Sequence, residues 1–355
     1  MKRSSIIISI ATASACLLGL AACTKDLTGM RIRFSARTRP EAPVTRTSYS
    51  GATYNSGASS YERIDWSDGD MIVLAMKNNE TAMATQNYSV QAISTSGVNS
   101  KTGLAPSGSE NGLIWGEGTH DFWSGYPASK VTVGDHTLSA TIPSSQVVSY
   151  SKKADNTIFF NPDMSNAFMV AGVQSAPAED GVNLDFYPAF TAFDFTVGAN
   201  DNTTVTSFEM ETATYETETA STMPIAGVAE TTFDPSGNMS FSFAASGTTS
   251  NTIGLVFNDD KNTAYNPIIT STTSMNFKVF ALPVDITGIK ITFNLSDGTK
   301  RSLRLKQNGS WITFPATAKI NITGLLVPGA VWYIDFDYPR QEQWIVHPDI
   351  EIGVE

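Results

Sequence analysis

The sequence has little of what cross-links, metal sites and most active sites are built from. Of its 355 residues, two are cysteines, Cys16 and Cys23, and three are histidines. Because both cysteines lie near the start, we expect no disulfide in the rest of the chain. A hydrophobic core must then supply the stability, and about 330 residues are ample for one or two cores. The histidines, His120, His136 and His347, have no second histidine or cysteine at metal-ligand spacing, so no metal is expected.

Catalytic motifs are missing as well. No Gly-x-Ser-x-Gly elbow, phosphate-binding loop or dinucleotide fingerprint occurs in the sequence. The two carboxylates of a glycosidase can lie far apart along a chain, so that class of enzyme alone stays open. The sequence therefore predicts a protein that is not an enzyme and carries no cofactor.

Positive charge is also scarce, with 23 basic against 34 acidic side chains and a net charge of −11. Without Lys2 and Arg3, which belong to the removable first segment, 21 basic side chains face 34 acidic ones and the net charge is −13. A surface of this sign repels phosphate backbones. We expect no nucleic acid among the partners.

Long apolar runs are absent except at the start of the chain. Residues 1–22 carry two basic residues, then the apolar run 6–20, then Ala21 and Ala22, which is the order of a secretory signal peptide. The run is too short to span a bilayer as a helix. The final Leu-Ala-Ala-Cys resembles the lipobox of bacterial lipoproteins, which implies export and lipid attachment at Cys23. An ordinary secreted protein with a chance cysteine is the alternative.

The rest of the chain has almost no stretch with a helical period and is rich in Thr, Ser, Val, Ile, Phe and Tyr. Apolar and polar residues alternate within 184–195 and 275–280, which indicates half-buried strands. Asp-Gly and Asn-Gly turns predict a meander of three strands, 289–295, 300–306 and 311–314. We expect an all-β fold of two tandem β-sandwich domains, of transthyretin-like or Greek-key type.

A polar run at 198–202 separates two strand-rich halves of plausible domain size. We therefore expect a tether, first strand and cleavage loop at 23–47, an N-terminal sandwich at 48–198, a C-terminal sandwich at 199–330 and a terminal strand segment at 331–355.

Short motifs follow one another along the chain in a characteristic order. They are Thr-Arg-Thr at 45–47, Ile-Asp-Trp-Ser-Asp-Gly-Asp at 64–70, Gly-Leu-Ile-Trp-Gly at 112–116, Phe-Trp-Ser-Gly-Tyr-Pro at 122–127, Pro-Ile-Ala-Gly at 224–227 and Ile-Asn-Ile-Thr-Gly-Leu at 320–325. Each alone also has a structural reading, such as Trp66 closing a strand and Gly69 turning at positive φ. Together with the lipobox, their order resembles that of the fimbrillin-like family, the subunits and accessory parts of type V pili.

The resemblance implies a structural or adhesive pilus component at the cell surface, held in the outer membrane by its N-terminal lipid. Its partners would be other pilus subunits and an Arg-specific protease that removes the first strand. A strand of a partner subunit then fills the opened groove. Such β-augmentation works because the incoming strand supplies the missing ladder hydrogen bonds and fills the emptied pockets.

The candidate for the displaced strand is the alternating segment 31–36, which places three side chains on one face: Ile32, Phe34 and Ala36. Arg46 is the best candidate for the cleavage site and Arg37 the second. The alternative is that these arginines only flank an exposed edge strand.

The candidate donor strand is the end of the chain, where three β-branched residues alternate with acidic residues or glycine: Ile350, Ile352 and Val354. The alternative is that this segment completes a sheet of its own chain.

Two non-polymerising roles are the rivals. A pilus anchor would keep its first strand and its lipid. A surface protein that binds glycans or host ligands would need exposed aromatic rings, for which the candidates are Trp115, Trp123, Tyr126 and Trp344. Aromatic residues within alternating strands are more often part of the core.

Overall fold

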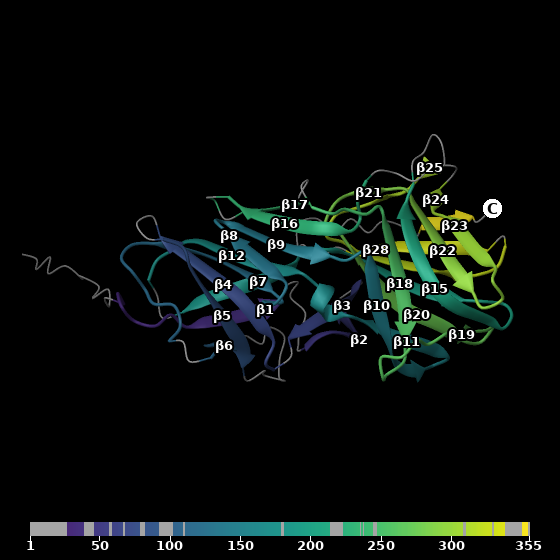
Figure 1. The fold of residues 1–355 in the computed structure, drawn as a ribbon, viewed down its shortest axis with the longest axis horizontal. Helices are drawn as coiled ribbons and strands as arrows, with labels where there is room; N and C mark the ends of the chain where they lie inside the picture. Colours follow the sequence, from purple (N-terminus) through teal and green to yellow (C-terminus); the bar gives the residue numbers. More distant parts are fainter. Residues whose placement is uncertain are drawn as a thin grey trace, which may run out of the picture.

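The computed structural model describes the chain in segments (Figure 1). They are residues 27–38, 46–56, 59–66, 68–78, 82–91, 102–108, 111–178, 181–213, 223–234, 236, 238–243, 247–307, 310–328, 330–337 and 350–353. The predicted signal peptide at 1–22 and Cys23 lie outside them, so export and lipid attachment stay predictions. Regular structure consists of 29 strands and one 3-10 turn, η1 (Met164–Asn166), in these segments. The all-β prediction is confirmed. None of the described residues belongs to a helix long and apolar enough to cross a membrane.

Seven strands form a closed barrel. Its order is β1 (Phe34–Thr38), β13 (Val182–Pro188), β12 (Met169–Ala176), β7 (His120–Tyr126), β4 (Met71–Asn78), β5 (Ala84–Gln91) and β6 (Thr102–Pro106). Alternate positions fill its interior, among them Phe122 of β7 and both Leu184 and Phe186 of β13, all fully buried. The barrel is the purple and blue half of the molecule in Figure 1.

A 12-stranded sheet forms the other half. From edge to edge its order is β23 (Lys300–Arg304), β22 (Ile289–Leu295), β15 (Thr203–Thr212), β18 (Thr252–Asn258), β10 (Ser145–Ala154), β11 (Thr157–Pro162), β20 (Ser274–Ala281), β14 (Thr191–Gly198), β27 (Lys319–Leu325), β28 (Val331–Asp337) and β29 (Ile350–Gly353), with β19 (Ile268–Ile269) on β15. In a flat sheet β15 and β20 would lie roughly 19 Å apart, at about 4.8 Å per strand. The rings of Phe208 and Phe277 on these strands lie 5.0 Å apart. The sheet therefore folds over, and its two layers enclose one core as in a β-sandwich.

A four-stranded sheet covers part of the outer face of the barrel. Its order is β17 (Met239–Phe243), β16 (Gly227–Phe233), β9 (Thr137–Ile142) and β8 (Val131–Gly134). The Phe233 ring packs so closely on Gly172 of β12 that a Cβ atom there would lie 2.5 Å from it. Three strand pairs complete the fold: β2 (Arg46–Ser56) with β3 (Ser59–Trp66), β21 (Ile286–Thr287) with β26 (Thr313–Phe314), and β24 (Lys306–Gln307) with β25 (Ser310–Trp311).

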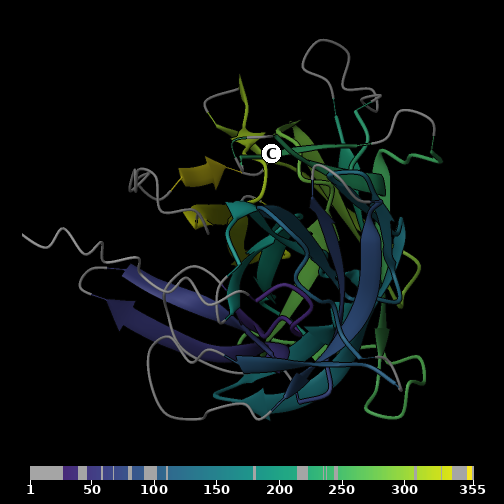
Figure 2. The same ribbon diagram turned by 90° about the vertical axis from the view of Figure 1, so that its left-hand side faces the viewer.

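Strands cross between the two halves of the sequence. β10 and β11 precede residue 198, yet they pair in parallel with β18 and β20 of the large sheet, while β16 follows residue 198 and pairs with β9. At the junction, the Gln146 amide donates to the Phe280 carbonyl at 2.6 Å and accepts from the Phe280 N–H at 3.0 Å. Figure 2, seen from the barrel end, shows the large sheet in green and yellow beyond the barrel. Strands that precede and follow residues 198–202 thus pair in the same sheets. The domain boundary at 198–202 stays a prediction.

Two local predictions need correction. The strands around Phe193 and Phe277 are not half-buried, because Asp194 and Lys278 on their other face are buried as well. The predicted meander forms its first hairpin, β22 with β23, but its third strand pairs with the second only near Lys306 and Trp311. It then leaves to pair with β21, because Phe314 packs against Phe193 in the core of the large sheet.

Candidate functional site

Strand β1 closes the barrel. It pairs in parallel with β13 over five residues and antiparallel with β6 over three. The Thr102 hydroxyl donates to the Ala36 carbonyl at 2.9 Å, and the Ser35 hydroxyl donates to the Asn183 side chain at 2.7 Å. Without β1, the barrel would have a gap one strand wide, and the edges of β6 and β13 that face this gap would be unpaired.

The three side chains predicted to share one face of the first strand all lie in the barrel core: Ile32, Phe34 and Ala36 are buried. The Phe34 ring stands edge-on to Tyr88, with centroids 5.3 Å apart. The removal of this strand would therefore empty three adjacent pockets inside the barrel.

The residues before β1 form a short ribbon with the loop before β7. Leu27 to Met30 make a turn in which the Met30 N–H donates to the Leu27 carbonyl at 2.8 Å and Gly29 adopts φ 80°. The Gly29 N–H donates to the Trp115 carbonyl at 2.8 Å, and the Ile32 N–H donates to the carbonyl of Leu113 at 2.9 Å. The start of the described chain is thus fixed to the end of the barrel.

The two candidate cleavage residues lie at different positions within their strands. Arg37 lies inside β1, opposite Asp185 of β13. Arg46 is the first residue of β2, opposite Trp66 of β3, and the segment 39–45 between the two arginines lies outside the described residues. Both arginines therefore belong to paired strands, Arg37 in the interior of β1 and Arg46 at the first residue of β2, and strand ends open more easily than strand interiors.

The corner after β3 has the structure that its motif predicts. Trp66 ends β3 and is buried, with its ring edge-on to Tyr126 at 5.3 Å and to Phe186 at 5.0 Å. Gly69 turns at φ 84°, and its N–H donates to the Val90 carbonyl at 2.9 Å. The motif therefore has a structural role: it fixes the start of β4 against the barrel core.

The candidate aromatic platform does not exist as an exposed surface. Trp115, Trp123 and Tyr126 are buried, and Trp344 lies outside the described residues. Trp115 and Tyr126 belong to the barrel core, and the Trp123 indole N–H donates to the Gly134 carbonyl beneath the four-stranded sheet at 3.0 Å. The prediction of a sugar-stacking platform is wrong for these three residues, because packing in the core takes up their rings.

The candidate donor strand lies at the edge of the large sheet. β29 pairs antiparallel with β28, from Ile350 opposite Ile334 to Gly353 opposite Val331. β28 in turn pairs with β27, from Tyr333 opposite Thr323 to Asp337 opposite Lys319, and its Trp332 and Ile334 are buried. Among the described strands β29 pairs with β28 alone, although it also lies beside β24, and Val354 lies outside the described residues.

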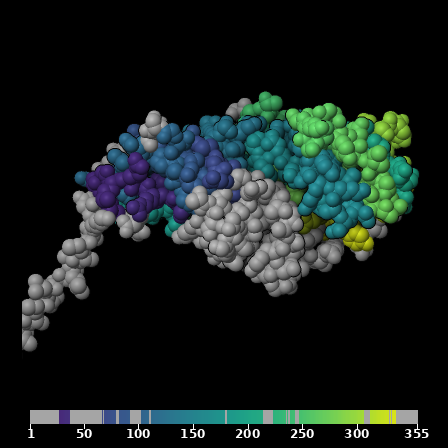
Figure 3. All heavy atoms as spheres, turned by 90° about the horizontal axis from the view of Figure 1, so that it is seen from below, coloured from purple at the N-terminus to yellow at the C-terminus, as the bar shows by residue number. Residues whose placement is uncertain are grey.

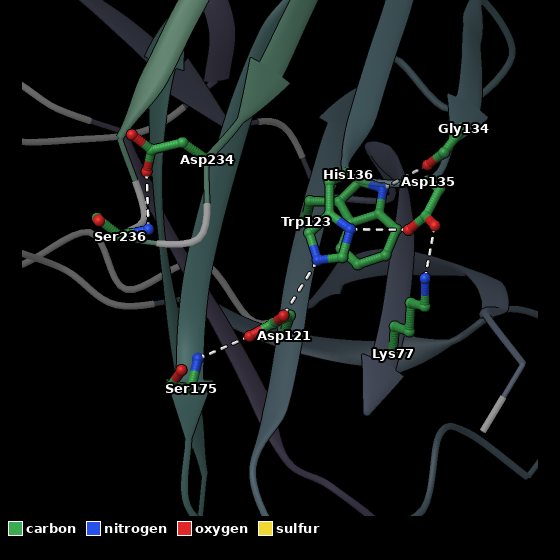
Figure 4. A network of polar contacts seen from close by, with 9 residues as sticks. All are labelled: Lys77, Asp121, Trp123, Gly134, Asp135, His136, Ser175, Asp234 and Ser236. Atoms are coloured by element: carbon green, nitrogen blue, oxygen red, sulfur yellow. Dashed lines mark hydrogen bonds and ion pairs between the residues drawn. The ribbon is translucent and has the colours of Figure 1, made fainter. Parts of the chain in front are cut away.

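A polar network that the sequence did not predict links the β8–β9 turn to the barrel (Figure 4). The His136 ring stacks on Trp123, with centroids 4.5 Å apart, and its Nε2 and Nδ1 lie 3.0 Å and 2.7 Å from the carboxylates of Asp121 and Asp135. Hydrogen bonds from Lys77 and His136 hold the pKa of Asp135 below its usual value. Each nitrogen of the His136 ring is hydrogen-bonded to a carboxylate. The network therefore fixes the β8–β9 turn and does not activate a nucleophile.

A second unpredicted cluster is a buried group of charges on β14, β20 and β27. The Asp194 carboxylate lies 3.0 Å from Lys278 Nζ and 3.3 Å from Lys319 Nζ, and it accepts from Asn276 at 2.8 Å. Burial alone would raise the pKa of Asp194, but the two ammonium groups outweigh it and lower the pKa. The Phe-Asp-Phe alternation around Asp194 could not predict this, because the lysines come from other strands. Nowhere among the described residues do three or more His, Cys, Asp or Glu side chains gather as a metal ion would need.

Known proteins resemble the chain in structure. No protein-family model matches it, and no curated protein matches its sequence. A candidate cell adhesion protein from Bacteroides uniformis superposes with a TM-score of 0.50 at 13% identity, over 88% of this chain and 98% of that one. A candidate cell adhesion protein from Bacteroides ovatus gives 0.49 at 11% identity, over 90% and 99% of the two chains. The tip fimbrial protein Mfa3 from Porphyromonas gingivalis, with a C-terminal truncation, gives 0.33 at 8% identity, over 76% and 94%.

The Bacteroides uniformis structure shows that the chain shares the fold of that protein over 88% of its length. This agrees with the resemblance that the short motifs carry.

Proposed function

We propose that this chain is a fimbrillin-like component of a type V-like pilus, exported as a lipoprotein to the outer membrane and assembled by exchange of strand β1. The observation that supports it most directly is the position of β1. One short segment near the N-terminus closes the barrel through backbone pairing on both edges and fills the core with Ile32, Phe34 and Ala36. A strand held in this way can be replaced by any strand with the same alternation.

In the proposed maturation, an Arg-specific protease cuts after Arg46, and the segment that carries β1 leaves the barrel. Arg37 is the second candidate, disfavoured because it lies in the interior of β1, whereas Arg46 is the terminal residue of β2. The vacated groove exposes unpaired N–H and C=O groups of β6 and β13, which favours the capture of a new strand.

The proposed donor is β29 of a neighbouring subunit. Ile350, Ile352 and Val354 have the same i, i+2, i+4 spacing as Ile32, Phe34 and Ala36. β29 also lies at a sheet edge and pairs with β28 alone among the described strands, so its release breaks one ladder. Its donation requires it to leave its own sheet.

The test treats the purified mature protein with an Arg-specific protease and follows the mass and the oligomeric state. We expect loss of the peptide that ends at Arg46, followed by oligomers. Arg46→Lys should block both steps, since lysine keeps the charge but is not recognised, whereas Arg37→Lys should block neither.

Deletion of residues 349–355 should leave cleavage intact and abolish the oligomers. Cleaved protein that keeps the β1 peptide and stays monomeric would contradict strand exchange. It would favour the second candidate function, a pilus anchor, which keeps β1 and its lipid at Cys23. The mass of the N-terminal peptide isolated from cells separates the two roles.

A further inference from the structure

The end of the barrel that carries the start of the described chain exposes an unusual share of apolar side chains. Among the described residues, eight large hydrophobic side chains are strongly exposed, and three of them lie here: Met30 at 45%, Met83 at 37% and Ile114 at 52%. Large exposed apolar side chains that gather in one place mark an interaction surface.

Strand pairing places the three residues at the same end. Met83 directly precedes β5, whose Ala84 pairs with Met76 near the end of β4, and Asn78 at that end pairs with His120 at the start of β7. Ile114 lies in the loop that leads to His120 and forms a bridge with Arg31. The Trp115 N–H donates to the Met30 carbonyl at 2.9 Å, which fixes Met30 beside this loop.

The side chains of Arg31 and Ile114 extend on the same side of the ribbon, because residues opposite one another in an antiparallel bridge share a face. Arg31 and Arg33 are both exposed, and Glu117 is the exposed acid of the adjoining loop. Isoleucine and methionine tips beside arginine stems form a surface that can enter the headgroup layer of a bilayer while the guanidinium groups stay at the phosphates.

Chain length places this end of the barrel at the membrane. The fixed Leu27 is the fourth residue after Cys23, so the two lie at most roughly 14 Å apart at about 3.5 Å per residue. A lipid at Cys23 would therefore hold Met30, Met83 and Ile114 close to the lipid surface. A tether of this kind gives a high effective concentration, so even a weak contact forms.

We propose that the barrel end formed by Met30, Met83 and Ile114 docks on the lipid headgroup surface and holds the tethered protein upright. The proposal rests on the lipid attachment included in the proposed function. In this orientation the large sheet, with β29 at its edge, points away from the membrane, since the purple N-terminal segment lies at one end of the elongated molecule and the large sheet at the other (Figures 1 and 3). Until cleavage at Arg46 removes Cys23 and Met30, the candidate donor strand would then lie away from the membrane.

The test uses the mature chain with a histidine tag in place of residues 1–23, which removes both cysteines, bound to phosphatidylcholine vesicles through nickel-chelating lipid. An environment-sensitive fluorophore is attached at Ile114→Cys or, as a matched control, at Ile268→Cys. Ile268 is equally exposed at 52%, on β19 at the other end of the molecule. We expect doxyl-labelled lipid to quench the label at 114 several-fold more strongly than the label at 268.

Met30→Glu with Met83→Glu should remove that difference without lowering the thermal unfolding midpoint. Equal quenching at both positions, or none at 114 while the protein is bound, would overturn the proposal. Vesicles with added phosphatidylglycerol should give the same ranking, because the contact is apolar. The nickel tether makes the result independent of acylation, which the mass of the N-terminal peptide from cells tests separately.

Discussion

The ring of Phe34 in β1 lies edge-on to the ring of Phe122 in β7, with centroids 5.5 Å apart and planes at 72°. β7 stands three places from β1 in the barrel order, so this contact passes through the interior rather than along the sheet. Phe34 therefore connects β1, the strand proposed to leave the barrel, with the opposite side of the barrel.

Phe34→Ala should destabilise the protein by about 3 to 5 kcal/mol, because it removes a buried ring and leaves a cavity between Tyr88 and Phe122. The free energy of unfolding in urea measures it. Ser35→Ala is the matched control on the other face of β1. It loses one hydrogen bond to Asn183, and it should cost about 1 kcal/mol. Equal losses for the two variants would show that the ring is not a core contact.

Asp194→Asn should cost about 3 to 5 kcal/mol at pH 7, because it leaves the buried ammonium group of Lys278 and the half-buried one of Lys319 without their carboxylate. Its pH dependence has a definite sign. The native pKa lies below the ordinary 3.8, so the contribution is present above that pH and is lost as pH falls below it. Unfolding free energies between pH 5 and 3 should fall less steeply in the variant. The exposed turn residue Asp297 provides the control, and Asp297→Asn should be milder.

His120 should titrate below its ordinary value of 6.5, because burial lowers its pKa against the opposing effects of Gly118 and Asp121. The Gly116 N–H donates to its Nε2, which keeps the ring neutral. The unfolded chain then binds more protons, so stability should fall as pH drops through 6.5 towards the native pKa. The Hε1 resonances of the three histidines can be followed by NMR, with His120→Asn for assignment. A midpoint at or above 6.5 would contradict the burial.

Alternation and turn residues predicted several features within single strands and hairpins, although not the burial of both faces of β14 and β20. Alternation placed Ile32, Phe34 and Ala36 on one buried face, and the Asp-Gly turn at 297 and 298 predicted the hairpin of β22 and β23. These features depend on neighbours along the chain, where the side-chain period and the backbone angles of turn residues act directly.

Pairing between distant strands could not be predicted in this way. Nothing within β10 or β11 indicates that their partners are β18 and β20, more than 100 residues later. The burial of Asp194 depends on Lys278 and Lys319 in the same manner. The likeness of motifs indicated the fold, but the removable strand, the cleavage site and the donor are still proposals that need experiments.

Gly324→Ala should destabilise the large sheet by about 1 to 3 kcal/mol. A Cβ atom at this position of β27 would overlap the indole ring of Trp332 on β28, which is fully buried and donates to the Leu325 carbonyl at 3.2 Å. The Trp332 ring must move, which also disturbs the ladder between β28 and β29. Thermal unfolding measures the loss. Gly103→Ala, with open space around the added methyl, should have little effect, and similar midpoints for both variants would count against the close contact.

The exchange of strands across residues 198–202 makes a prediction about folding. A fragment of residues 199–355 lacks β10, β11 and β14, of which β11 and β14 supply Phe160, Phe193 and Phe195 to the core of the large sheet. Those rings pack against Phe257, Phe314 and Phe208 of the fragment, which would then be exposed.

We therefore expect this fragment to lack the dispersed NMR spectrum of a folded β domain when expressed alone, and to gain it when co-expressed with residues 24–198. A well-dispersed spectrum for the isolated fragment would instead mean that the polar run at 198–202 separates independently folding domains, and that the contacts of β10, β11 and β14 are not required for folding.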